Sequence, residues 1–456
     1  MSFLTELPSQ RVLVVGAGVT GEGLLKYLNH IGVSDITILD EKAKSAAGAQ
    51  VISSLNETNF DLAIVSPGWK LSHPAIEALK TAGVSILGEI DFAWKIKEEI
   101  APAQKWIALT GTNGKTTTVQ MVESILHAAD IHGIACGNVG TTVIEALMNE
   151  KPFDLLALEL SSFQIEWSTT AQFESVAILN IADDHIDWHG SFENYAATKL
   201  SLLHRTQVGI LNLNDPEVAL RASAWNGKKV FFGLDTPAEN EIGLVENLLI
   251  DRAFSADAQS AEVIAELVDI NPSVPHNVMN AMAAAGLALS TGISHADIKK
   301  GLAQFKPDHH RLELVLEANE ISWVDDSKAT NPHAALAALG SYLSVVWIAG
   351  GLAKGARMDS LIKRAASRVQ SAILIGEDRE LIAEAIAEFA PDITVHLVDK
   401  TGTAQELMDD VVAKAKEVAQ PGDTVLLAPA CASMDQFTSY AQRGDFFAAS
   451  VKRAHS

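Results

Sequence analysis

Residues 106–118, WIALTGTNGKTTT, constrain the fold of this 456-residue chain more than any other stretch. The apolar residues 106–109 predict a buried strand, and residues 119–126 continue at helical spacing after a glycine-rich turn. In such a turn, small residues let backbone N–H groups approach an anion, and the dipole of the following helix favours negative charge. The pattern therefore predicts a loop that binds the phosphates of ATP.

The loop residues form the predicted core of the nucleotide site. Lys115 is expected to reach the terminal phosphates, and the Thr116 hydroxyl is expected to bind magnesium. The usual G-x-x-x-x-G-K-[ST] pattern is incomplete, because Leu109 stands where its first glycine belongs. A lysine-bearing surface turn is the alternative, but the flanking strand and helix favour ATP binding. The predicted ATP-binding residues of the loop are Gly111, Thr112, Asn113, Gly114, Lys115, Thr116 and Thr117.

Composition limits the possible partners. The length suggests roughly three domains. Acidic residues outnumber basic ones 57 to 34, so the net charge of −23 disfavours binding to nucleic acid or to anionic membranes. No apolar run reaches the roughly 18–20 residues that a membrane span needs. MSFLTELPSQ does not resemble a secretory signal, and the two cysteines suit neither a disulfide framework nor a metal site. We expect a cytoplasmic protein without membrane insertion.

A second glycine motif begins the chain. Residues 11–15 predict a strand, GAGVTG follows, and a helix to about His30 leads to a strand over 35–39 that ends in Asp40. This is the dinucleotide fingerprint, which alone would suggest a dehydrogenase, although such turns accept many diphosphates. Further strand–helix pairs predict a small doubly wound sheet over residues 1–97. A helix is expected to end near Lys97, with a polar linker over 98–105.

The rest of the chain also alternates strands with helices, which predicts α/β domains with parallel sheets over 98–307 and 308–456. Ligands of such sheets lie beyond the carboxyl ends of the strands. Strands over 155–160 and 175–179 place Asn138, Glu159, Asp184 and His185 at that edge together with Lys115. Residues 230–275 suggest a small side sheet, and an alanine-rich helix is expected over 278–290. The last domain has expected strands near 324, 345–349, 372–375 and 424–427.

Several residues at the ends of these strands could bind ligands or metal, and for each of them a purely structural role is the alternative. Glu159 ends a buried strand and is either a magnesium ligand or half of a salt bridge. His185, in the cluster 183–189, can bind metal, whereas His189 can merely finish a turn. Lys199 can be an exposed helical lysine, and Arg311 a surface arginine or a phosphate ligand. Residues 325–331 are either a binding turn or a capped helix start. The glycine-rich 350–355 has the same ambiguity.

Twelve motifs in order resemble the Mur ligase family of cytoplasmic enzymes that make peptidoglycan precursors. They are GAGVTG, SPG, LTGTNGKTTT, GNVG, LELSSFQ, NIADDHIDWHG, ATKLSLL, PHNVMNAMAAAGLA, HHRLELV, WVDDSKATNPHAA, IAGGLAKGA and the pair LLAPACASMDQF and QRGDFF. The resemblance implies a Rossmann-like N-terminal domain for a UDP-sugar, a central P-loop ATPase domain with a parallel sheet, and a Rossmann-like C-terminal domain that closes over both. DSKATN, PACASMDQF and LELSSFQ most resemble the member that joins D-glutamate to UDP-N-acetylmuramoyl-L-alanine, in cell-wall synthesis and thus in cell shape and division.

The resemblance also implies residue roles. Lys115, His185 and Lys199 would be catalytic, with Lys199 matching a lysine that family members carbamylate. The metal site, expected to hold two Mg²⁺ ions, would use Thr116, Glu159, His185 and carbamylated Lys199. The UDP-substrate would contact Val19, Thr20, Asp40, Ser66, Asn138, Ser161 and Gln164. ATP would also contact Asn277, Asn280, Arg311 and Asp326. D-Glutamate would contact Lys328, Thr330, Lys354, Ser433 and Phe437.

The implied reaction is ATP-dependent amide formation through an acyl phosphate, carried out by a monomer. Another Mur-type or folylpolyglutamate-type ligase is the nearest alternative. Lys328 and Lys354 favour an acidic amino acid, since a diamino acid would need a carboxylate-bearing pocket. A non-catalytic nucleotide-binding regulator would not need Glu159, His185 and Lys199 beside the loop. A dehydrogenase would leave the phosphate loop unexplained.

Overall fold

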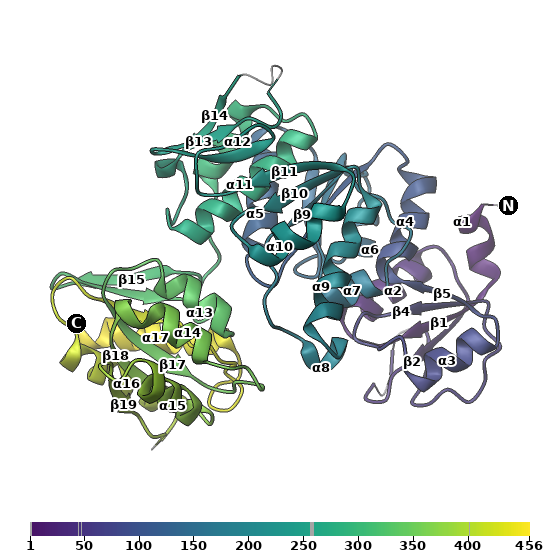
Figure 1. Ribbon diagram of the computed structural model, residues 1–456. Coiled ribbons are helices and arrows are strands. Elements are labelled where there is room, and N and C mark those ends of the chain that lie inside the picture. Colours follow the sequence, from purple (N-terminus) through teal and green to yellow (C-terminus); the bar gives the residue numbers. More distant parts are fainter. Residues whose placement is uncertain (1, 44, 47, 256–259, 401) are drawn as a thin grey trace. The chain divides into compact units, whose positions relative to one another are not determined.

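The computed structural model describes residues 2–43, 45–46, 48–255, 260–400 and 402–456. It contains three sheets flanked by helices, one within each of the three residue ranges expected above (Figure 1). By compactness the chain forms two units. The first comprises Met1–Ser273 and Asn277–Phe305, and the second Val274–His276 and Lys306–Ser456.

The first sheet is parallel, in the order β3-β2-β1-β4-β5. Its inner strands β1 and β4 are almost entirely buried and apolar, as expected where helices cover both faces. The strands are β1 (Arg11–Val15), β2 (Asp35–Leu39), β3 (Gln50–Ile52), β4 (Leu62–Val65) and β5 (Ser85–Gly88). The helices are α1 (Phe3–Glu6), α2 (Val19–His30), α3 (Pro74–Thr81) and α4 (Glu89–Ile100).

Helix α4 runs three residues beyond the expected end at Lys97, so the linker before β6 shrinks to residues 101–104. The cause is a tertiary contact. The Glu99 carboxylate accepts hydrogen bonds from the Ser2 hydroxyl and the Phe3 N–H, both at 2.6 Å, and from the Leu4 N–H at 3.2 Å. Glu99, a charged residue of the expected linker, thus belongs to the helix and fastens the N-terminal segment.

The central sheet has the order β14-β13-β12-β11-β10-β9-β6-β8-β7. Its pairing is parallel as far as β12 and antiparallel from β12 to β14. The strands are β6 (Lys105–Thr110), β7 (Gly133–Gly137), β8 (Leu155–Glu159), β9 (Ser175–Ile178), β10 (Val208–Asn212), β11 (Lys228–Phe232), β12 (Glu241–Val245), β13 (Leu248–Asp251) and β14 (Glu262–Glu266).

The expectation of a separate side sheet over 230–275 is wrong. Strand β12 pairs with β11, so these strands lengthen the main sheet. Phe232, Ile242 and Leu249 lie in one apolar core with helix α11 (Pro275–Ser290). This helix begins at Pro275 rather than at 278, because proline is well suited to the first turn. The other helices are α5 (Lys115–Ala128), α6 (Val143–Leu147), α7 (Ser162–Glu166), α8 (Ile186–His189), α9 (Phe192–Leu200), α10 (Pro216–Arg221) and α12 (His295–Gln304).

The third sheet has the order β15-β16-β20-β17-β18-β19, parallel except for β15 against β16. Its strands are β15 (Glu313–Ala318), β16 (Ile321–Asp325), β17 (Val345–Gly350), β18 (Val369–Ile375), β19 (Thr394–Leu397) and β20 (Thr424–Leu427). The edge strands β15 and β19 did not stand out in the sequence. Its helices are α13 (Pro332–Leu339), α14 (Asp359–Ala365), α15 (Arg379–Phe389), α16 (Ala404–Val418) and α17 (Tyr440–Ala454).

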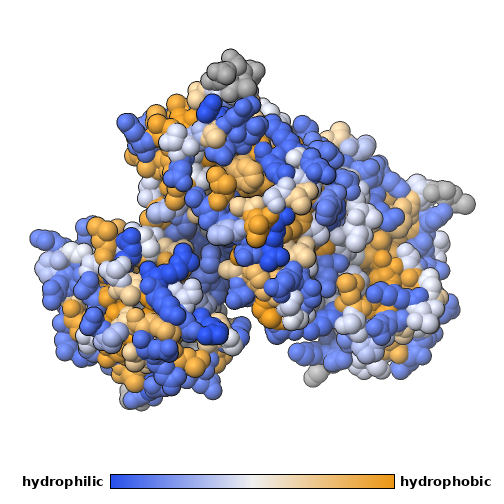
Figure 2. Space-filling model, viewed as in Figure 1, coloured by the Kyte–Doolittle hydropathy of each residue, from blue (hydrophilic) through white to orange (hydrophobic). Residues whose placement is uncertain are grey.

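The first and central sheets share an apolar core, which explains why they form one unit. Val12, Phe92 and Leu156 belong to this core, and the rings of Trp94 and Trp106 meet edge to face at 5.1 Å. The face seen in Figure 2 mixes hydrophilic residues with scattered apolar patches. Among the residues that the structure describes, no helix combines the length and apolar character needed to cross a membrane.

Candidate active site

The phosphate loop lies between β6 and α5, and two of its glycines are required by packing. Gly114 has φ +83°, and a Cβ there would approach the Oδ1 atom of Asn280 to 2.5 Å. A Cβ on Gly111 would lie 2.9 Å from the Cβ of Leu179. The fold thus brings Asn280, on α11, to the loop as the resemblance implied. Asn277, one turn earlier on α11, donates its amide to the Pro272 carbonyl at 2.9 Å.

The loop is held by two residues that were not singled out from the sequence. Asn180, which follows β9, accepts the Asn113 N–H at 2.8 Å and donates to the Asn113 carbonyl at 3.0 Å. The Tyr195 hydroxyl lies 3.0 Å from the Thr112 hydroxyl. The position of Asn180 after a strand was a usable signal, whereas nothing in the spacing pointed to Tyr195.

Two lysine amines meet at one carbonyl of the loop. Lys115 Nζ donates to the Gly111 and Thr112 carbonyls at 2.8 and 2.9 Å, and Lys199 Nζ donates to the same Gly111 carbonyl at 2.9 Å. Lys199 is only 1% exposed, so the alternative of an exposed helical lysine is wrong. Burial, assisted by the nearby positive charge of Lys115, holds the pKa of Lys199 well below its usual value. Lys199 therefore favours the uncharged amine, which is the nucleophilic form.

The surroundings of the Glu159 carboxylate indicate whether a metal ion could bind at this site. Its carboxylate is 1% exposed, and one oxygen accepts a hydrogen bond from the Asn138 side chain at 3.0 Å. The other oxygen is buried and has no hydrogen-bond partner among the described residues. The alternative role, a salt bridge, is not seen, because no basic side chain among the described residues lies within ion-pair distance of Glu159. An orphaned buried carboxylate oxygen suits a cation such as magnesium.

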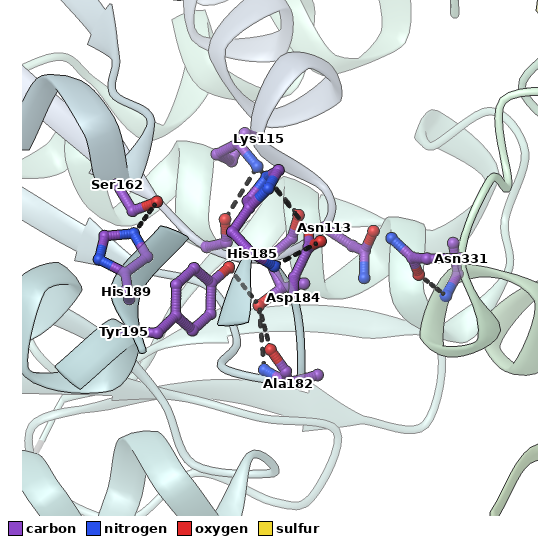
Figure 3. Close-up of polar contacts among 12 residues, drawn as sticks. Asn113, Lys115, Ser162, Ala182, Asp184, His185, His189, Tyr195 and Asn331 are labelled. Atoms are coloured by element: carbon purple, nitrogen blue, oxygen red, sulfur yellow. Dashed lines mark hydrogen bonds and ion pairs between the residues drawn. The ribbon is translucent and has the colours of Figure 1, made fainter. Parts of the chain in front are cut away.

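His185 lies near the phosphate loop: Figure 3 shows it together with Lys115 and Asp184, and the charges of Lys115 and Lys199 act on its ring. It adopts φ +53° just before α8, and its ring lies 4.7 Å from that of Phe163. Burial lowers the pKa of His185, Asp184 opposes this, and Lys199 and Lys115 lower it further. The neutral ring can donate a lone pair to a metal. His189 instead contacts the Ser162 hydroxyl at 3.0 Å and stacks on Phe163, which is a structural role.

The glycine-rich turn of the first sheet is held by Asp40. Its carboxylate accepts backbone N–H groups of Ala17 at 2.9 Å, Lys42 at 2.8 Å and Ala43 at 3.0 Å, and these bonds lower the pKa of Asp40. Ser66 packs against Gly16 in the same turn. Val19 and Thr20 begin helix α2, and the Val19 side chain is exposed.

A cavity of about 540 Å³ opens beside this turn. The rings of Trp69 and His73 on its wall lie 4.5 Å apart. Lys70 donates to the Asp187 carbonyl at 3.2 Å and lies 5.3 Å from the Trp188 ring, so the cavity adjoins the segment that carries His185. The lining residues are Asp40, Glu41, Lys42, Gly68, Trp69, Lys70, Ser72 and His73. Of these, Asp40 was predicted from the sequence to contact the UDP-substrate, and the SPG motif that follows β4 includes Gly68.

Ser161 and Gln164 form a reciprocal cap at the start of α7. The Gln164 N–H donates to the Ser161 hydroxyl at 3.2 Å, and the Ser161 N–H donates to the Gln164 side-chain carbonyl at 3.1 Å. Since α7 follows β8 directly, this cap and Asn138 lie close to Glu159. These three residues are the predicted contacts to the UDP-substrate from the central sheet.

The second unit brings its own predicted residues together. Arg311 lies near Asp326 and partly offsets the effect of burial, which raises the pKa of Asp326 to about 7. Lys328 Nζ lies 3.9 Å from the centre of the Tyr440 ring. Paired backbone bonds between Leu352 and Ala432 set the segment of Lys354 beside that of Ser433.

The two remaining predicted D-glutamate residues differ in their surroundings. Phe437 donates its N–H to the Ser433 carbonyl and buries its ring in the apolar core, edge to face with Phe446. Thr330 follows Lys328 in the 325–331 turn, and its N–H donates to the Lys328 carbonyl.

Arg443 connects the segments that carry Lys328 and Ser433. It was not singled out from the sequence. Its fully buried guanidinium donates to the Ser327 hydroxyl and carbonyl at 3.0 Å and to the Cys431 carbonyl at 3.2 Å. It also approaches the Gly350 carbonyl at 3.4 Å. The QRGDFF motif contained the residue, but an arginine on a helix gives no sign of its burial.

Comparison with known proteins agrees with this geometry. Residues 109–288 match the Mur ligase middle domain, and residues 310–431 match the Mur ligase, glutamate ligase domain. The chain belongs to the Mur ligase family of ATP-dependent amide ligases, with its α/β three-domain architecture.

Within that family, relatives that match over nearly the full length and share about 40–45% of residues are UDP-N-acetylmuramoylalanine–D-glutamate ligases. The enzyme of Streptomyces coelicolor is 44% identical, with 98% of this chain and 99% of the relative covered. That of Thermobifida fusca is 45% identical with the same coverage. Among solved structures, a pseudomurein peptide ligase from Methanothermus fervidus has a TM-score of 0.60 at 18% identity, covering 92% of this chain and 96% of that one. UDP-N-acetylmuramate–alanine ligase from Thermotoga maritima has a TM-score of 0.56 at 17% identity, covering 98% and 100%. These two likenesses concern the fold alone.

Proposed function

We propose that the chain joins D-glutamate to UDP-N-acetylmuramoyl-L-alanine at the expense of ATP, in cytoplasmic synthesis of peptidoglycan precursors. The observation that carries the proposal is the pair of lysine amines on the Gly111 carbonyl beside the orphaned oxygen of Glu159. The full-length similarity to ligases of that name supports the choice of substrates. One chain is the working unit, since residues proposed for all three ligands lie on it.

The first step activates the alanyl carboxylate. One of its oxygens attacks the γ-phosphorus of ATP, ADP leaves, and an acyl phosphate forms. Lys115, at the start of α5, offsets the charge on the transferred group, and the loop N–H groups orient the phosphates. Asn277, Asn280, Arg311 and Asp326 complete our assignment for ATP.

The second step forms the amide bond. The amine of D-glutamate attacks the carbonyl carbon of the acyl phosphate, inorganic phosphate leaves, and the amine gives up a proton. Lys328 and Lys354 suit the carboxylates of the incoming amino acid, and Thr330, Ser433 and Phe437 complete that assignment. Water must be kept from the acyl phosphate, because hydrolysis would waste it.

Two magnesium ions would be held by Thr116, Glu159, His185 and a carbamate on Lys199. Bound magnesium neutralises charge on the phosphates during transfer. Burial lowers the pKa of the Lys199 amine, which suits it to add carbon dioxide with loss of a proton. The resulting carbamate anion would pair with Lys115 and relieve the crowding of two amines at one carbonyl.

The uridine diphosphate end would occupy the cavity beside the turn of the first sheet. Trp69 offers an aromatic surface there, and Lys42 and Lys70 offer positive charge. Asp40 lines this cavity, and Val19, Thr20 and Ser66 are assigned to the substrate at the adjoining glycine-rich turn. Asn138, Ser161 and Gln164 are assigned to the part of the substrate nearer to Glu159.

The test is release of phosphate from ATP in the presence of UDP-N-acetylmuramoyl-L-alanine and magnesium. D-Glutamate is compared with L-glutamate, L-alanine, L-lysine and no amino acid. We expect release only when both the UDP-substrate and D-glutamate are present. Release with a different amino acid would overturn the assigned pocket, and no release with any of them would overturn the ligase function.

A further inference from the structure

The short helix α8 directly follows the candidate metal ligand His185 and is only partly buried. Its residues 186–187 are exposed, Trp188 is half-buried and His189 is buried. The His185 side chain is itself 45% exposed. His189 fastens the far end of the helix through its contact with the Ser162 hydroxyl. Burial therefore fixes the far end of α8 but not the end that bears His185.

Trp188 and His185 share one aromatic neighbour, Phe163. The centre of the Phe163 ring lies 4.7 Å from that of the His185 ring and 4.6 Å from that of the Trp188 ring. The Trp188 indole N–H also donates to the Glu166 carboxylate at 2.8 Å. The position of His185 is thus linked to that of Trp188, both through the short helix and through the ring that they share.

Lys70 supports α8 from outside the central sheet. It follows β4 of the first sheet, and its Nζ donates to the Asp187 carbonyl at 3.2 Å and lies 5.3 Å from the centre of the Trp188 ring. A carbonyl in the last turn of a helix has no N–H partner within that helix, and the helix dipole favours a cation there. The ammonium meets both needs, so Lys70 holds the backbone of α8 and one of its rings together.

The segment that carries Lys70 is fixed to the central sheet at a second point. The Trp167 indole N–H donates to the Trp69 carbonyl at 2.7 Å, and the Trp167 side chain is buried. Trp69 and Lys70 both line the cavity assigned above to uridine diphosphate. This segment therefore forms part of the cavity wall and reaches α8 through the same residue, Lys70.

A ligand in the cavity would order the Lys70 side chain. An exposed lysine loses rotamer freedom when it is held in one place. A diphosphate attracts the ammonium, whose three N–H groups are enough for a phosphate oxygen and the Asp187 carbonyl together. A metal ion on His185 favours the same arrangement, because it requires the ring at one position. Each ligand then lowers the entropic cost of binding the other.

We propose that Lys70 is a positioning residue which anchors α8, and with it His185, to the wall of the uridine diphosphate cavity and so couples that cavity to the magnesium site. The inference rests on the proposed function, because it takes both ligands from it. Binding at either site strengthens binding at the other by the same factor. Lys70 acts on the metal site through α8 and touches no reacting atom.

The test uses UDP-N-acetylglucosamine as a probe, because it carries uridine diphosphate but no carboxylate that could bind the metal directly. Calorimetry measures its dissociation constant without nucleotide, in the absence and presence of saturating magnesium. For the wild-type protein we expect magnesium to tighten binding about tenfold. Lys70→Met keeps the length of the side chain but removes the ammonium, so this gain should fall below about twofold. Magnesium that binds the free probe acts alike on every variant, so the comparison isolates the protein.

Lys42→Met is the matched control, because Lys42 lines the same cavity and the change removes the same charge. Among the described residues, no hydrogen bond or ion pair joins the Lys42 ammonium to α8. This variant should bind the probe more weakly in both conditions and keep the gain from magnesium. Lys70→Arg should keep most of the gain, since a guanidinium can donate to the Asp187 carbonyl and stack on Trp188.

A second readout separates positioning of His185 from a general loss of structure. In the phosphate-release assay, Lys70→Met should raise the magnesium concentration for half-maximal rate about fivefold and leave KM for D-glutamate near its wild-type value. The residues assigned to D-glutamate lie in the other compact unit. Thermal unfolding checks that the variant is folded.

Three results would overturn the inference. One is a Lys70→Met protein that keeps the wild-type gain from magnesium. Another is a Lys42→Met protein that loses the gain as fully, since charge in the cavity would then be the cause. The third is a wild-type protein that does not bind the probe, or binds it equally well without magnesium. Failure of the proposed function looks different: phosphate release from ATP with UDP-N-acetylmuramoyl-L-alanine would not depend on D-glutamate.

Discussion

At the scale of single residues, the site is assembled from groups whose positions are unfavourable for the unliganded protein. Glu159 buries a carboxylate with one oxygen unsatisfied, and Lys199 buries an amine. The second oxygen of Glu159 costs free energy because its desolvation is not repaid by a partner, and Lys199 costs free energy because burial disfavours its charged form. Such costs are tolerable where a ligand supplies the missing partner, which is how a binding site differs from a stable core.

Glu159→Gln tests this trade-off. Removal of the charge should raise the melting temperature of the unliganded protein by a few degrees, at roughly 2–4 °C per kcal/mol for a domain of this size. The same change should lower phosphate release by about 100-fold or more, because the cation loses an anionic ligand. Thermal unfolding and the phosphate-release assay measure the two effects.

The control for that experiment is Glu123→Gln. Glu123 is a half-buried carboxylate on α5 whose oxygen already accepts the Ala135 N–H at 2.9 Å. Its replacement should leave phosphate release close to the wild-type rate. A Glu159→Gln protein that is less stable and fully active would contradict the assignment of a metal ligand.

At the scale of elements, the turns that follow parallel strands are held in place relative to one another by single polar side chains. In the first unit Asn180 does this for the phosphate loop, through paired bonds with Asn113. In the second unit Arg443 does it for the turns after β16, β17 and β20. A guanidinium suits the task, because it spreads five donors over a plane.

Arg443→Lys should therefore separate these turns. A single ammonium cannot reach three carbonyls, so buried acceptors would be left unpaired at a cost of about 2 kcal/mol. Since two of these turns carry Lys328 and Ser433, we expect KM for D-glutamate to rise at least about fivefold. Steady-state kinetics and thermal unfolding report the two changes.

ATP titration is the companion measurement for Arg443→Lys. The phosphate loop and most other residues assigned to ATP belong to the other compact unit, whereas only Arg311 and Asp326 belong to the unit of Arg443. Affinity for ATP should therefore change less than KM for D-glutamate. Equal weakening of both would mean that the substitution disturbs the whole chain rather than the three turns.

At the scale of the whole molecule, net charge sets the kind of partner. The −23 charge of the chain surrounds a few sites where lysines and helix N-termini present positive charge to small anions. The phosphate loop and the cavity beside Lys42 and Lys70 are such places. Small phosphorylated ligands can enter them without approaching the acidic remainder of the surface closely.

A long polyanion cannot avoid that surface. We expect labelled double-stranded DNA to show no binding by fluorescence anisotropy even at about 50 mM salt, where electrostatic attraction would be strong. ATP in the same buffer should bind, which serves as the positive control. Saturable DNA binding that weakens with added salt would contradict the expectation.

Local sequence determined much of this protein. The repeating pattern of buried strands and helices, and the glycines that let backbone approach phosphate, depend on neighbours a few residues apart, so they can be recognised from residues 106–126 or 11–21 alone. Positions after strands also marked Glu159 and His185, because carboxyl ends of parallel strands share one edge.

Tertiary structure alone decided which distant groups meet. The extension of α4 depends on Glu99 meeting the N-terminal segment, and the continuous central sheet depends on β12 pairing with β11. The lowered pKa of Lys199 depends on burial by elements far apart in the chain. Burial and long-range pairing are properties of the packed chain, and no local pattern encodes them.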